Sequence, residues 1–526
     1  MSSWELIAFA TVACAIALHL NVRLQTTQFW VHKELDTLGN NSGHAARRGK
    51  AVICGSGIAG LMAARECMDH FEQVVLVDPE FSKTLDGASK SRSMQYHSSH
   101  LYSIPFAEGL RRLWPCFDQR ADEVEQAEYN GETNLHIDGT CIRSPARDKP
   151  SSFGMRRSTL EPLLHRLLME GTPEAKNRLT IIDGTVRKLA NASHVGRGDT
   201  IASVEGRYIH GGKDFQIDDI DLLIGRAQCG VKWLEEAGFT PPQRVSYSPH
   251  LRYTTITFTG ISEEVYTSLP IPAERRGGAL VFYPDPNISR SGIVFSKVDG
   301  DAVNLCLNSW GSSNFPKQAE DVIPCLADFG FSKPLPAWFM EAVELLVENG
   351  SATFSTAQLA SCFQLQYDRL SNCPSNFIAI GDSVMVLNPI FGQGCVKGMA
   401  GILTLDSMLR SEPSSASGRL SPSFSQRFFK KQAERTHHFW EANKAKDYAY
   451  STTEPIPGET REYGRFLRWI DKVISQAVRE DTEVGHALLC VRQMLAPETT
   501  FLQPSILLRI LWAHVKQYCR TTSYRA

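Results

Sequence analysis

Three glycines and one acidic residue near the start of the chain have the types and spacing of a site for a dinucleotide. Gly55, Gly57 and Gly60 follow an apolar run that begins at Ala51, and Asp78 ends a second apolar run. One glycine permits the tight turn after a strand, another lets the backbone approach a pyrophosphate, and the third lets helix and strand pack closely. Free N–H groups at the start of the next helix attract phosphate, and an acid about 20 residues on can bind ribose hydroxyls. The alternative is a glycine turn in another α/β protein, and this stretch alone leaves the dinucleotide open.

A second stretch, residues 377–409, repeats the order of strand, acid, glycines and helix. An apolar run leads to Gly-Asp at 381–382, and Gly-Gln-Gly at 392–394 opens a long helical segment. Asp382 can accept hydrogen bonds from a sugar-like polyol, and the backbone amides of Gly394 and Cys395 can face an electron-rich ring edge. The alternative is an ordinary strand–loop–helix turn whose glycines serve only its geometry.

The elements that position these residues follow from the pattern of apolar residues. Runs rich in Val, Ile, Thr and Tyr predict strands, and apolar residues at helical spacing predict helices. A strand–helix–strand start followed by short strands indicates an α/β fold, with a Rossmann-like domain, an antiparallel β substrate domain and a C-terminal helical region. Strands are expected at 74–77, 179–182, 200–204, 252–258, 279–283, 292–295 and 303–307, and helices at 106–113, from 157, and at 428–447, 463–477, 484–494 and 505–518.

The composition argues against several classes of protein. The chain has 526 residues, 42% of them hydrophobic, and a formal net charge of −2. These values indicate a globular protein of about three domains and give no reason to expect nucleic-acid binding. Thirteen cysteines occur without regular spacing, and no His/Cys cluster has the spacing of zinc ligands. We therefore expect no metal and no disulfide framework, and reduced thiols in an enzyme that faces the cytosol.

The N-terminal segment departs from this composition. Residues 6–20 are almost entirely apolar, although slightly short of the ~20 residues that span a bilayer. Basic residues follow the run, and Glu5 is the only charged residue before it. This distribution favours a single-pass membrane anchor, with the rest of the chain in the cytosol at the endoplasmic reticulum, over a signal peptide or a buried helix. Sequons that would stay unused in this orientation begin at Asn40, Asn191, Asn287 and Asn349.

The chain is expected to divide into five parts. They are the anchor at 1–22, a linker at 23–49, interleaved cofactor-binding and substrate domains at 50–410 with the substrate sheet at about 240–360, a Ser/Pro-rich connection at 411–425, and a helical region at 426–526.

The two glycine stretches, taken as a pair, resemble the FAD-binding signatures of the single-component flavoprotein monooxygenases, the aromatic-hydroxylase-like superfamily. The nearer resemblance is to the branch of 2-polyprenyl-6-methoxyphenol hydroxylase and related FAD-dependent oxidoreductases. It extends from about Lys50 to the C-terminus and includes SRSMQYH at 91–97, RSTLEPLL at 157–164, FW at 439–440 and LAPETTFLQP at 495–504. The resemblance implies a Rossmann-like FAD-binding domain and FAD as the cofactor.

The resemblance also implies roles for individual residues. Those that match cofactor-binding positions are Gly55, Gly57, Gly60, Asp78, Arg92, Arg157, Asp382, Gly394 and Cys395. The three glycines of the first stretch and Asp78 would hold the ADP part of FAD. Asp382 would bind the ribityl or pyrophosphate region. The amides at 394–395 would lie at the pyrimidine end of the isoalloxazine. Arg157 looks like the arginine that contacts the cofactor, and Arg92 like the loop arginine near the flavin, with a solvated loop charge as its alternative.

Other positions are less informative or depart from the pattern of the superfamily. Gln95 and His97 fall where its substrate-side loop begins, but a lone histidine is more often structural. The middle signature is shortened, because Asp221 to Ile224 runs directly into Gly225-Arg226 without the usual Asp-Ala-Ser element. The histidine that usually follows the second Gly-Asp is also absent, with Val384 and Met385 in its place. The shortened motif puts the reductive step in question.

The activity that the resemblance implies is oxygenation by a flavin. NAD(P)H would reduce FAD, and O2 would supply one oxygen atom to hydroxylate or epoxidise a lipophilic small molecule, with no side-chain general base assigned. Two rivals stay open: a reductase or dehydrogenase of the geranylgeranyl-reductase kind, and a flavin-binding protein without turnover. A flavin-dependent halogenase is disfavoured, because the chain contains no Trp-x-Trp-x-Ile-Pro stretch.

Overall fold

The computed structural model gives the positions of most of the chain. It describes residues 29–40, 47–90, 95–129, 132–137, 140–141, 151–170, 177–191, 200–225, 229–311, 314–331, 333–413 and 419–523. The predicted membrane anchor at residues 1–22 and Arg92 therefore lie outside the described residues.

The first glycine stretch lies at the centre of a seven-stranded sheet. Its strand order is β18-β10-β1-β2-β7-β8-β9, parallel from β18 to β7 and antiparallel beyond. Its strands are β1 (Arg48–Cys54), β2 (Phe71–Asp78), β7 (Leu179–Asn191), β8 (Ile201–Tyr208), β9 (Asp214–Asp218), β10 (Leu222–Gly225) and β18 (Phe377–Ala379). Residues 51–54 of β1 are buried on both faces, as a central parallel strand requires.

Two helices, α3 (Ile58–His70) and α13 (Gly394–Ser411), pack against each other beside this sheet. Around them lie α2 (Trp30–Thr37), α4 (Phe81–Leu85), α5 (Ile104–Leu113), α6 (Phe117–Asp122), α7 (Arg157–Met169) and α9 (Gly230–Glu236). The shortened middle motif forms β10, which pairs with β1 and with β18, so this segment keeps its place in the sheet. Residues 226–228, which follow it, lie outside the described part of the chain.

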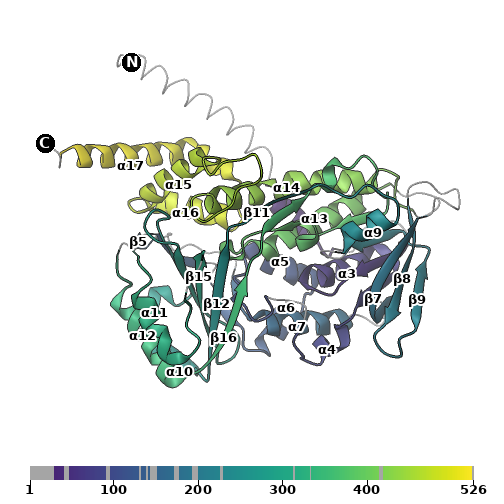
Figure 1. The fold of residues 1–526 in the computed structure, drawn as a ribbon, viewed down its shortest axis with the longest axis horizontal. Coiled ribbons are helices and arrows are strands. Elements are labelled where there is room, and N and C mark those ends of the chain that lie inside the picture. The colour runs from purple at the N-terminus through teal and green to yellow at the C-terminus, as the bar shows by residue number, and fades with distance from the viewer. Residues whose placement is uncertain are drawn as a thin grey trace, which may run out of the picture.

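A second seven-stranded sheet has the order β16-β12-β15-β14-β13-β4-β5. Its strands are β4 (Glu132–Ile137), β5 (Thr140–Cys141), β12 (Leu251–Thr259), β13 (Gly278–Tyr283), β14 (Ser291–Lys297), β15 (Val303–Trp310) and β16 (Ser351–Gln358). On one face Phe282 and Phe295 pack against Phe339 of a covering helix, at ring-centroid distances of 4.8 and 5.7 Å. That face carries α10 (Glu263–Ser268), α11 (Val322–Ala327) and α12 (Ala337–Asn349), at the opposite end of the molecule from β8 and β9 (Figure 1).

Smaller elements complete the fold outside the two large sheets. They are β3 (Ala127–Tyr129) paired with β6 (Ser152–Gly154), the sheet β11-β17-β19 (Arg244–Tyr247, Cys362–Leu365, Met385–Val386), and the 3₁₀ turns η2 (Ala273–Arg275), η3 (Ala319–Asp321), η4 (Tyr367–Arg369), η5 (Gly381–Ser383) and η6 (Pro389–Phe391). The strands and helices predicted from the sequence overlap elements of the structure, most of them to within a few residues, although β7 continues to Asn191, nine residues past the predicted end at 182. The substrate-side sheet also contains strands that were not predicted, namely β16 at 351–358 and β4 and β5 from residues 132–141.

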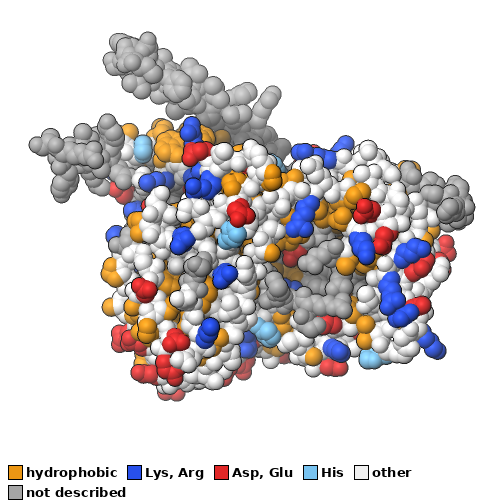
Figure 2. Space-filling model, in the orientation of Figure 1, with side chains coloured by type: hydrophobic (Ala, Val, Ile, Leu, Met, Phe, Trp, Pro, Cys, Tyr) orange, Lys and Arg blue, Asp and Glu red, His pale blue; other side chains and the backbone are white. Residues whose placement is uncertain are grey.

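The end of the chain is helical, as predicted. It comprises α14 (Phe424–Asp447), α15 (Arg465–Val478), α16 (Thr482–Arg492), η7 (Glu498–Leu502) and α17 (Pro504–Ser523). Figure 1 shows α15 to α17 together above β5, and in Figure 2 hydrophobic side chains gather over this region. The exposed aromatic residues there include Phe466, Trp469 and Trp512.

The predicted membrane-anchored localisation requires a correction. Within the described residues, no helix combines the length and the apolar character that crossing a bilayer demands. The prediction was based on the hydropathy of residues 6–20 and on the basic residues that follow them, and residues 6–20 lie outside the described part of the chain. We therefore withdraw the anchored localisation.

Candidate active site

The turn between β1 and α3 leaves an open space at a helix N-terminus. Gly55 has a φ of 104°, and its N–H donates a 2.8 Å hydrogen bond to the Val77 carbonyl, which closes the turn onto β2. A Cβ on Gly60 would lie 1.9 Å from the Gly55 carbonyl oxygen, so this position admits only glycine. A Cβ on Gly57 would meet nothing within 4 Å. The space in front of the α3 N-terminus therefore fits a pyrophosphate.

Asp78 braces this turn. Its Oδ2 accepts a 2.8 Å hydrogen bond from the Ser56 N–H, and its Oδ1 accepts one of 2.8 Å from the Glu80 N–H. The side chain is buried. Since each carboxylate oxygen can accept a second hydrogen bond, a ribose hydroxyl remains a possible partner. The structure thus places Asp78 at the glycine turn and gives it a bracing role that its spacing did not indicate.

A buried carboxylate with two cations lies next to the turn, and the sequence did not predict it. Glu161 on α7 is fully buried, and its Oε1 lies 2.7 Å from Lys90 Nζ while its Oε2 accepts a 2.8 Å hydrogen bond from Arg157 Nε. Lys90 Nζ also donates to the Ser56 carbonyl at 2.7 Å. Although burial opposes ionisation, Arg157 and Lys90 hold the pKa of Glu161 below its usual value. The group carries one net positive charge beside the proposed pyrophosphate position.

His165 completes this group as a neutral side chain. Its Nδ1 donates to the Glu161 carbonyl at 2.7 Å, so its Nε2 accepts from Ser56 Oγ at 3.1 Å. Burial, reinforced by Lys90, lowers the pKa of His165 to about 4. The one sequence signal for this network was the four-residue spacing of Arg157 and Glu161 on a helix, which places both on one face.

The second signature forms a similar site at the N-terminus of α13. Asp382 follows β18, and its Oδ1 accepts a 2.8 Å hydrogen bond from Nζ of the buried Lys397, which also donates to the Met385 carbonyl. The surrounding protein partly desolvates Asp382 and so opposes its ionisation, but Lys397 and then Arg157 lower its pKa, so the carboxylate stays charged. Its side chain is 61% exposed, which leaves Oδ2 open to a polyol. A Cβ on Gly394, the first residue of α13, would meet nothing within 4 Å.

The two helix N-termini belong to one site. A Cβ on Gly381 would lie 3.2 Å from the Ala59 side chain at the start of α3, and a Cβ on Gly398 of α13 would lie 3.8 Å from it. The charge of Arg157 lowers the pKa of both Asp382 and Cys395, so this arginine lies near the second signature as well as beside Glu161. The structure thus brings together two motifs separated by more than 300 residues.

The remaining predicted residues have more limited roles in the described structure. Cys395 is partly buried, and burial raises the pKa of its thiol to about 12, so its backbone amide is its useful group. His97 is exposed, with Nε2 3.2 Å from Ser89 Oγ, and Gln95 accepts a hydrogen bond from the Ser98 N–H. His100, which the sequence analysis did not single out, has a pKa lowered to about 4 by burial and then by Arg157.

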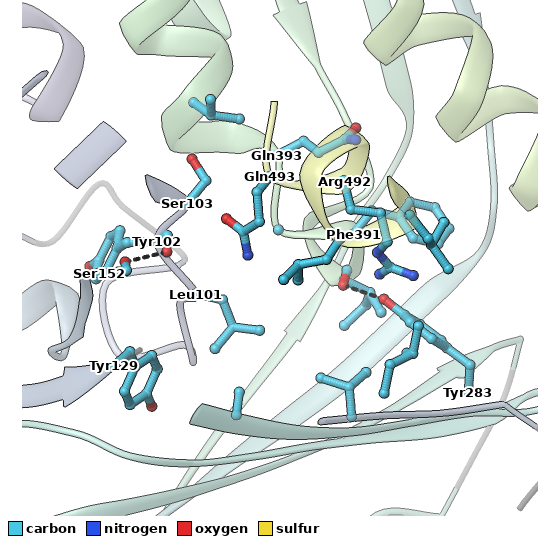
Figure 3. Close-up of a pocket in the computed structure, with 18 of the residues that line it drawn as sticks. Leu101, Tyr102, Ser103, Tyr129, Ser152, Tyr283, Phe391, Gln393, Arg492 and Gln493 are labelled. Atoms are coloured by element: carbon cyan, nitrogen blue, oxygen red, sulfur yellow. Dashed lines mark hydrogen bonds between the residues drawn. The ribbon is translucent and has the colours of Figure 1, made fainter. Parts of the chain in front are cut away.

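An apolar pocket of about 100 Å³ lies beside this site. Its walls come from residues 101–103, from strands β4 and β13, from the turn at 390–393 and from α16. In Figure 3, Tyr129 and Ser152 lie at one end and Tyr283 and Arg492 at the other. The Tyr283 hydroxyl donates a 2.9 Å hydrogen bond to the Ile390 carbonyl, which ties β13 to the turn that leads into α13. The pocket therefore adjoins the second helix N-terminus.

Comparison with known proteins finds a relative in sequence and several solved structures of similar fold. No protein-family model matches the chain. The chain is 24% identical over 494 residues to Protein Rv3254 of Mycobacterium tuberculosis, covering 89% of this chain and 93% of that protein. Similar solved structures are the flavin-dependent brominase Bmp2 (12% identity, TM-score 0.53, 90% of this chain and 100% of that one), p-nitrophenol 4-monooxygenase PnpA from Pseudomonas putida DLL-E4 (13%, 0.54, 86% and 99%) and Klebsiella pneumoniae HpxO complexed with FAD and uric acid (13%, 0.50, 85% and 97%).

These likenesses concern the fold. The chain shares the fold of this flavin-dependent brominase, of p-nitrophenol 4-monooxygenase and of the FAD-bound HpxO, which confirms the predicted α/β class. Because fold alone does not fix function, the chemistry must be argued from the site.

Proposed function

We propose that this protein is an FAD-dependent monooxygenase that uses NAD(P)H and O2 to hydroxylate or epoxidise a small, largely apolar molecule, in secondary metabolism. The observation that carries the proposal is the meeting of two helix N-termini, each with an open glycine position, next to an apolar pocket. Such a pocket with a few polar groups is typical of a small-molecule site.

The residues present fit FAD. The α3 N-terminus, with Lys90 and Arg157 beside it, would hold the negatively charged pyrophosphate. Asp382 would accept hydrogen bonds from the ribityl chain, and the amides at 394–395 would face the flavin ring. Arg92 is proposed as a further contact near the flavin. When bound, FAD would take up electrons from the nicotinamide and activate O2.

The protein's own contribution is positioning and the exclusion of water. Apolar side chains of β4, β13 and α16 shape much of the pocket wall, and a ligand bound against them would exclude water. The paired charges Lys397–Asp382 and Lys90–Glu161 hold these side chains in place at the rims of the cofactor site before a ligand binds. Since the histidines near the site, His100 and His165, have lowered pKa values, they are neutral at pH 7 and give no reason to assign an acid catalyst.

The test of this function is the behaviour of the purified, FAD-loaded protein toward NADPH and NADH. Anaerobic addition should bleach the flavin spectrum, and air should restore it with consumption of O2. Bleaching with electron transfer to substrate, but without oxygen incorporation, would indicate a reductase or dehydrogenase instead. Flavin that neither nucleotide reduces, with or without candidate substrates, would contradict the proposed activity.

A further inference from the structure

We propose that Arg492 recognises an anionic group of the substrate, such as an aromatic carboxylate, in the pocket next to α13. This inference rests on the proposed function and deepens it by naming the substrate class. Among the described residues that line the pocket, Arg492 is the one with a charged side chain. The sequence analysis assigned it no role.

Ion pairing distinguishes Arg492 from the cations of the cofactor site. Across the described part of the chain, no carboxylate lies within 4.0 Å of the Arg492 guanidinium, whereas the cations of the cofactor site, Lys90, Arg157 and Lys397, each have one. Arg492 is half-buried at the end of α16. A guanidinium in an apolar surrounding gains most from a planar acceptor that can take two parallel hydrogen bonds, as a carboxylate does.

The buried carboxylate of Asp447 is already hydrogen-bonded to other side chains. Asp447 lies at the end of α14, but its oxygens are committed: Oδ1 accepts from Trp310 Nε1 and from Asn388 Nδ2, both at 2.7 Å. Its Oδ2 accepts from the Tyr247 hydroxyl at 2.8 Å. Asp447 therefore serves to join β15, the turn before α13 and α14, and leaves Arg492 available to a ligand.

Arg492 lies near Tyr283, which lines the same pocket. The guanidinium carbon of Arg492 lies 5.9 Å from the ring centroid of Tyr283, and Figure 3 shows the side chain directed toward that end of the pocket. The Tyr283 ring is itself fixed by its hydrogen bond to the Ile390 carbonyl. A second cation lies nearby: Nζ of Lys446 is 5.4 Å from the ring centroid of Phe391, and Phe391 lines the pocket. Arg492 and Lys446 thus bring positive charge to the part of the pocket near Tyr283 and Phe391, and many of the other lining side chains are apolar, which suits an aromatic acid.

The test compares a matched pair of probes, benzoate and benzamide, which have the same shape but differ in charge. Binding to the purified FAD-loaded protein is measured by calorimetry for wild type, Arg492→Gln and Arg492→Lys. The control is Arg465→Gln, which removes an exposed arginine from the neighbouring helix α15. Thermal unfolding of each variant shows whether it is folded.

We expect wild type and the Arg465 variant to bind benzoate at least about tenfold more tightly than benzamide. Arg492→Gln should remove this preference, and Arg492→Lys should keep part of it. The inference is overturned if Arg492→Gln keeps the preference, or if wild type shows none, whether it binds both probes equally or neither. If Arg492→Gln does not fold, a preference as strong in Arg492→Lys as in wild type would count against bidentate recognition.

This experiment separates the inference from the proposed function, because calorimetry needs no turnover. A chain that takes up no flavin but prefers benzoate through Arg492 would refute the proposed function and keep the anion site. A protein that binds flavin and is reduced by NADPH, but does not prefer benzoate, would support the proposed function and refute the anion site.

Discussion

Asp382 and Lys397 are linked by a 2.8 Å hydrogen bond that joins the end of strand β18 to the first turn of α13. The lysine is almost fully buried and the carboxylate is mostly exposed, so one oxygen of Asp382 is anchored while the other faces open space. A strand-end acid held in this way is charged and oriented before any ligand arrives. In our account it binds the ribityl chain of FAD.

Replacing this acid should weaken flavin binding. Asp382→Asn removes the charged acceptor and leaves the buried Lys397 without its partner, so we expect FAD affinity to fall about tenfold or more. The measurement is the dissociation constant of FAD from quenching of its fluorescence. Asp214→Asn, in an exposed ion pair on β9, is the control and should bind FAD as wild type does. Unchanged affinity in Asp382→Asn would remove this residue from the site.

Two glycines of the first turn should respond differently to the same substitution. Gly57→Val adds a side chain to empty space, so the fold should survive while FAD affinity falls at least about tenfold. Gly60→Val forces Cβ against the Gly55 carbonyl, so it should cost about 3 kcal/mol of folding free energy or more. Flavin content and thermal unfolding of both variants check this pair. Normal FAD binding by Gly57→Val would show that the pyrophosphate lies elsewhere.

The buried Glu161 should matter for stability. Glu161→Gln leaves Lys90 and Arg157 without a counter-charge, and we expect a loss of about 3 kcal/mol at pH 7, measured by urea unfolding. Since the folded-state pKa of Glu161 is lowered, its contribution is full above the ordinary carboxyl range and is lost as the pH falls below it. The difference between variant and wild type should therefore shrink in acid. A difference that is constant with pH would refute this origin.

A second buried network should give the opposite pH dependence. His70 Nε2 lies 2.8 Å from Glu66 and 3.5 Å from Asp406, and Arg410 donates to Asp406 at 2.6 Å. Burial alone would lower the pKa of His70, but hydrogen bonds to Asp406 and Glu66 raise it to about 9, and burial raises the pKa of Glu66 to about 7.

The stabilisation by His70 is therefore full below about pH 6.5 and is lost as the pH rises through about 9. We expect His70→Gln to cost about 3–5 kcal/mol near neutral pH and distinctly less at alkaline pH. Urea unfolding at both conditions measures this, and His250→Gln, at an exposed histidine, should have little effect at either. A cost for His70→Gln that grows with pH would contradict the assignment.

The parts of the fold set by local rules were predictable from the sequence. The turn at Gly55, the close approach at Gly60 and the helix after Gly394 each depend on a few neighbouring residues. The strands β12 to β15 were evident because β-branched and aromatic residues are concentrated there.

The residues that the sequence did not reveal are those placed by tertiary packing. Nothing local to Lys90 indicates that it meets Glu161, and nothing in α16 indicates that Arg492 reaches a pocket formed by β13. The strands β4 and β5 join the second sheet from far upstream, which periodicity cannot show. The anchored localisation failed because it was based on the hydropathy and the flanking charges of one segment considered without the fold.

The central claim is that two helix N-termini bind one FAD. The most direct test is the visible absorption spectrum of the wild-type protein after incubation with FAD and removal of free flavin, with Gly57→Val and Asp382→Asn in parallel. Our account predicts close to one bound flavin per wild-type chain and a clear loss in both variants. A folded wild-type protein that emerges colourless would contradict it.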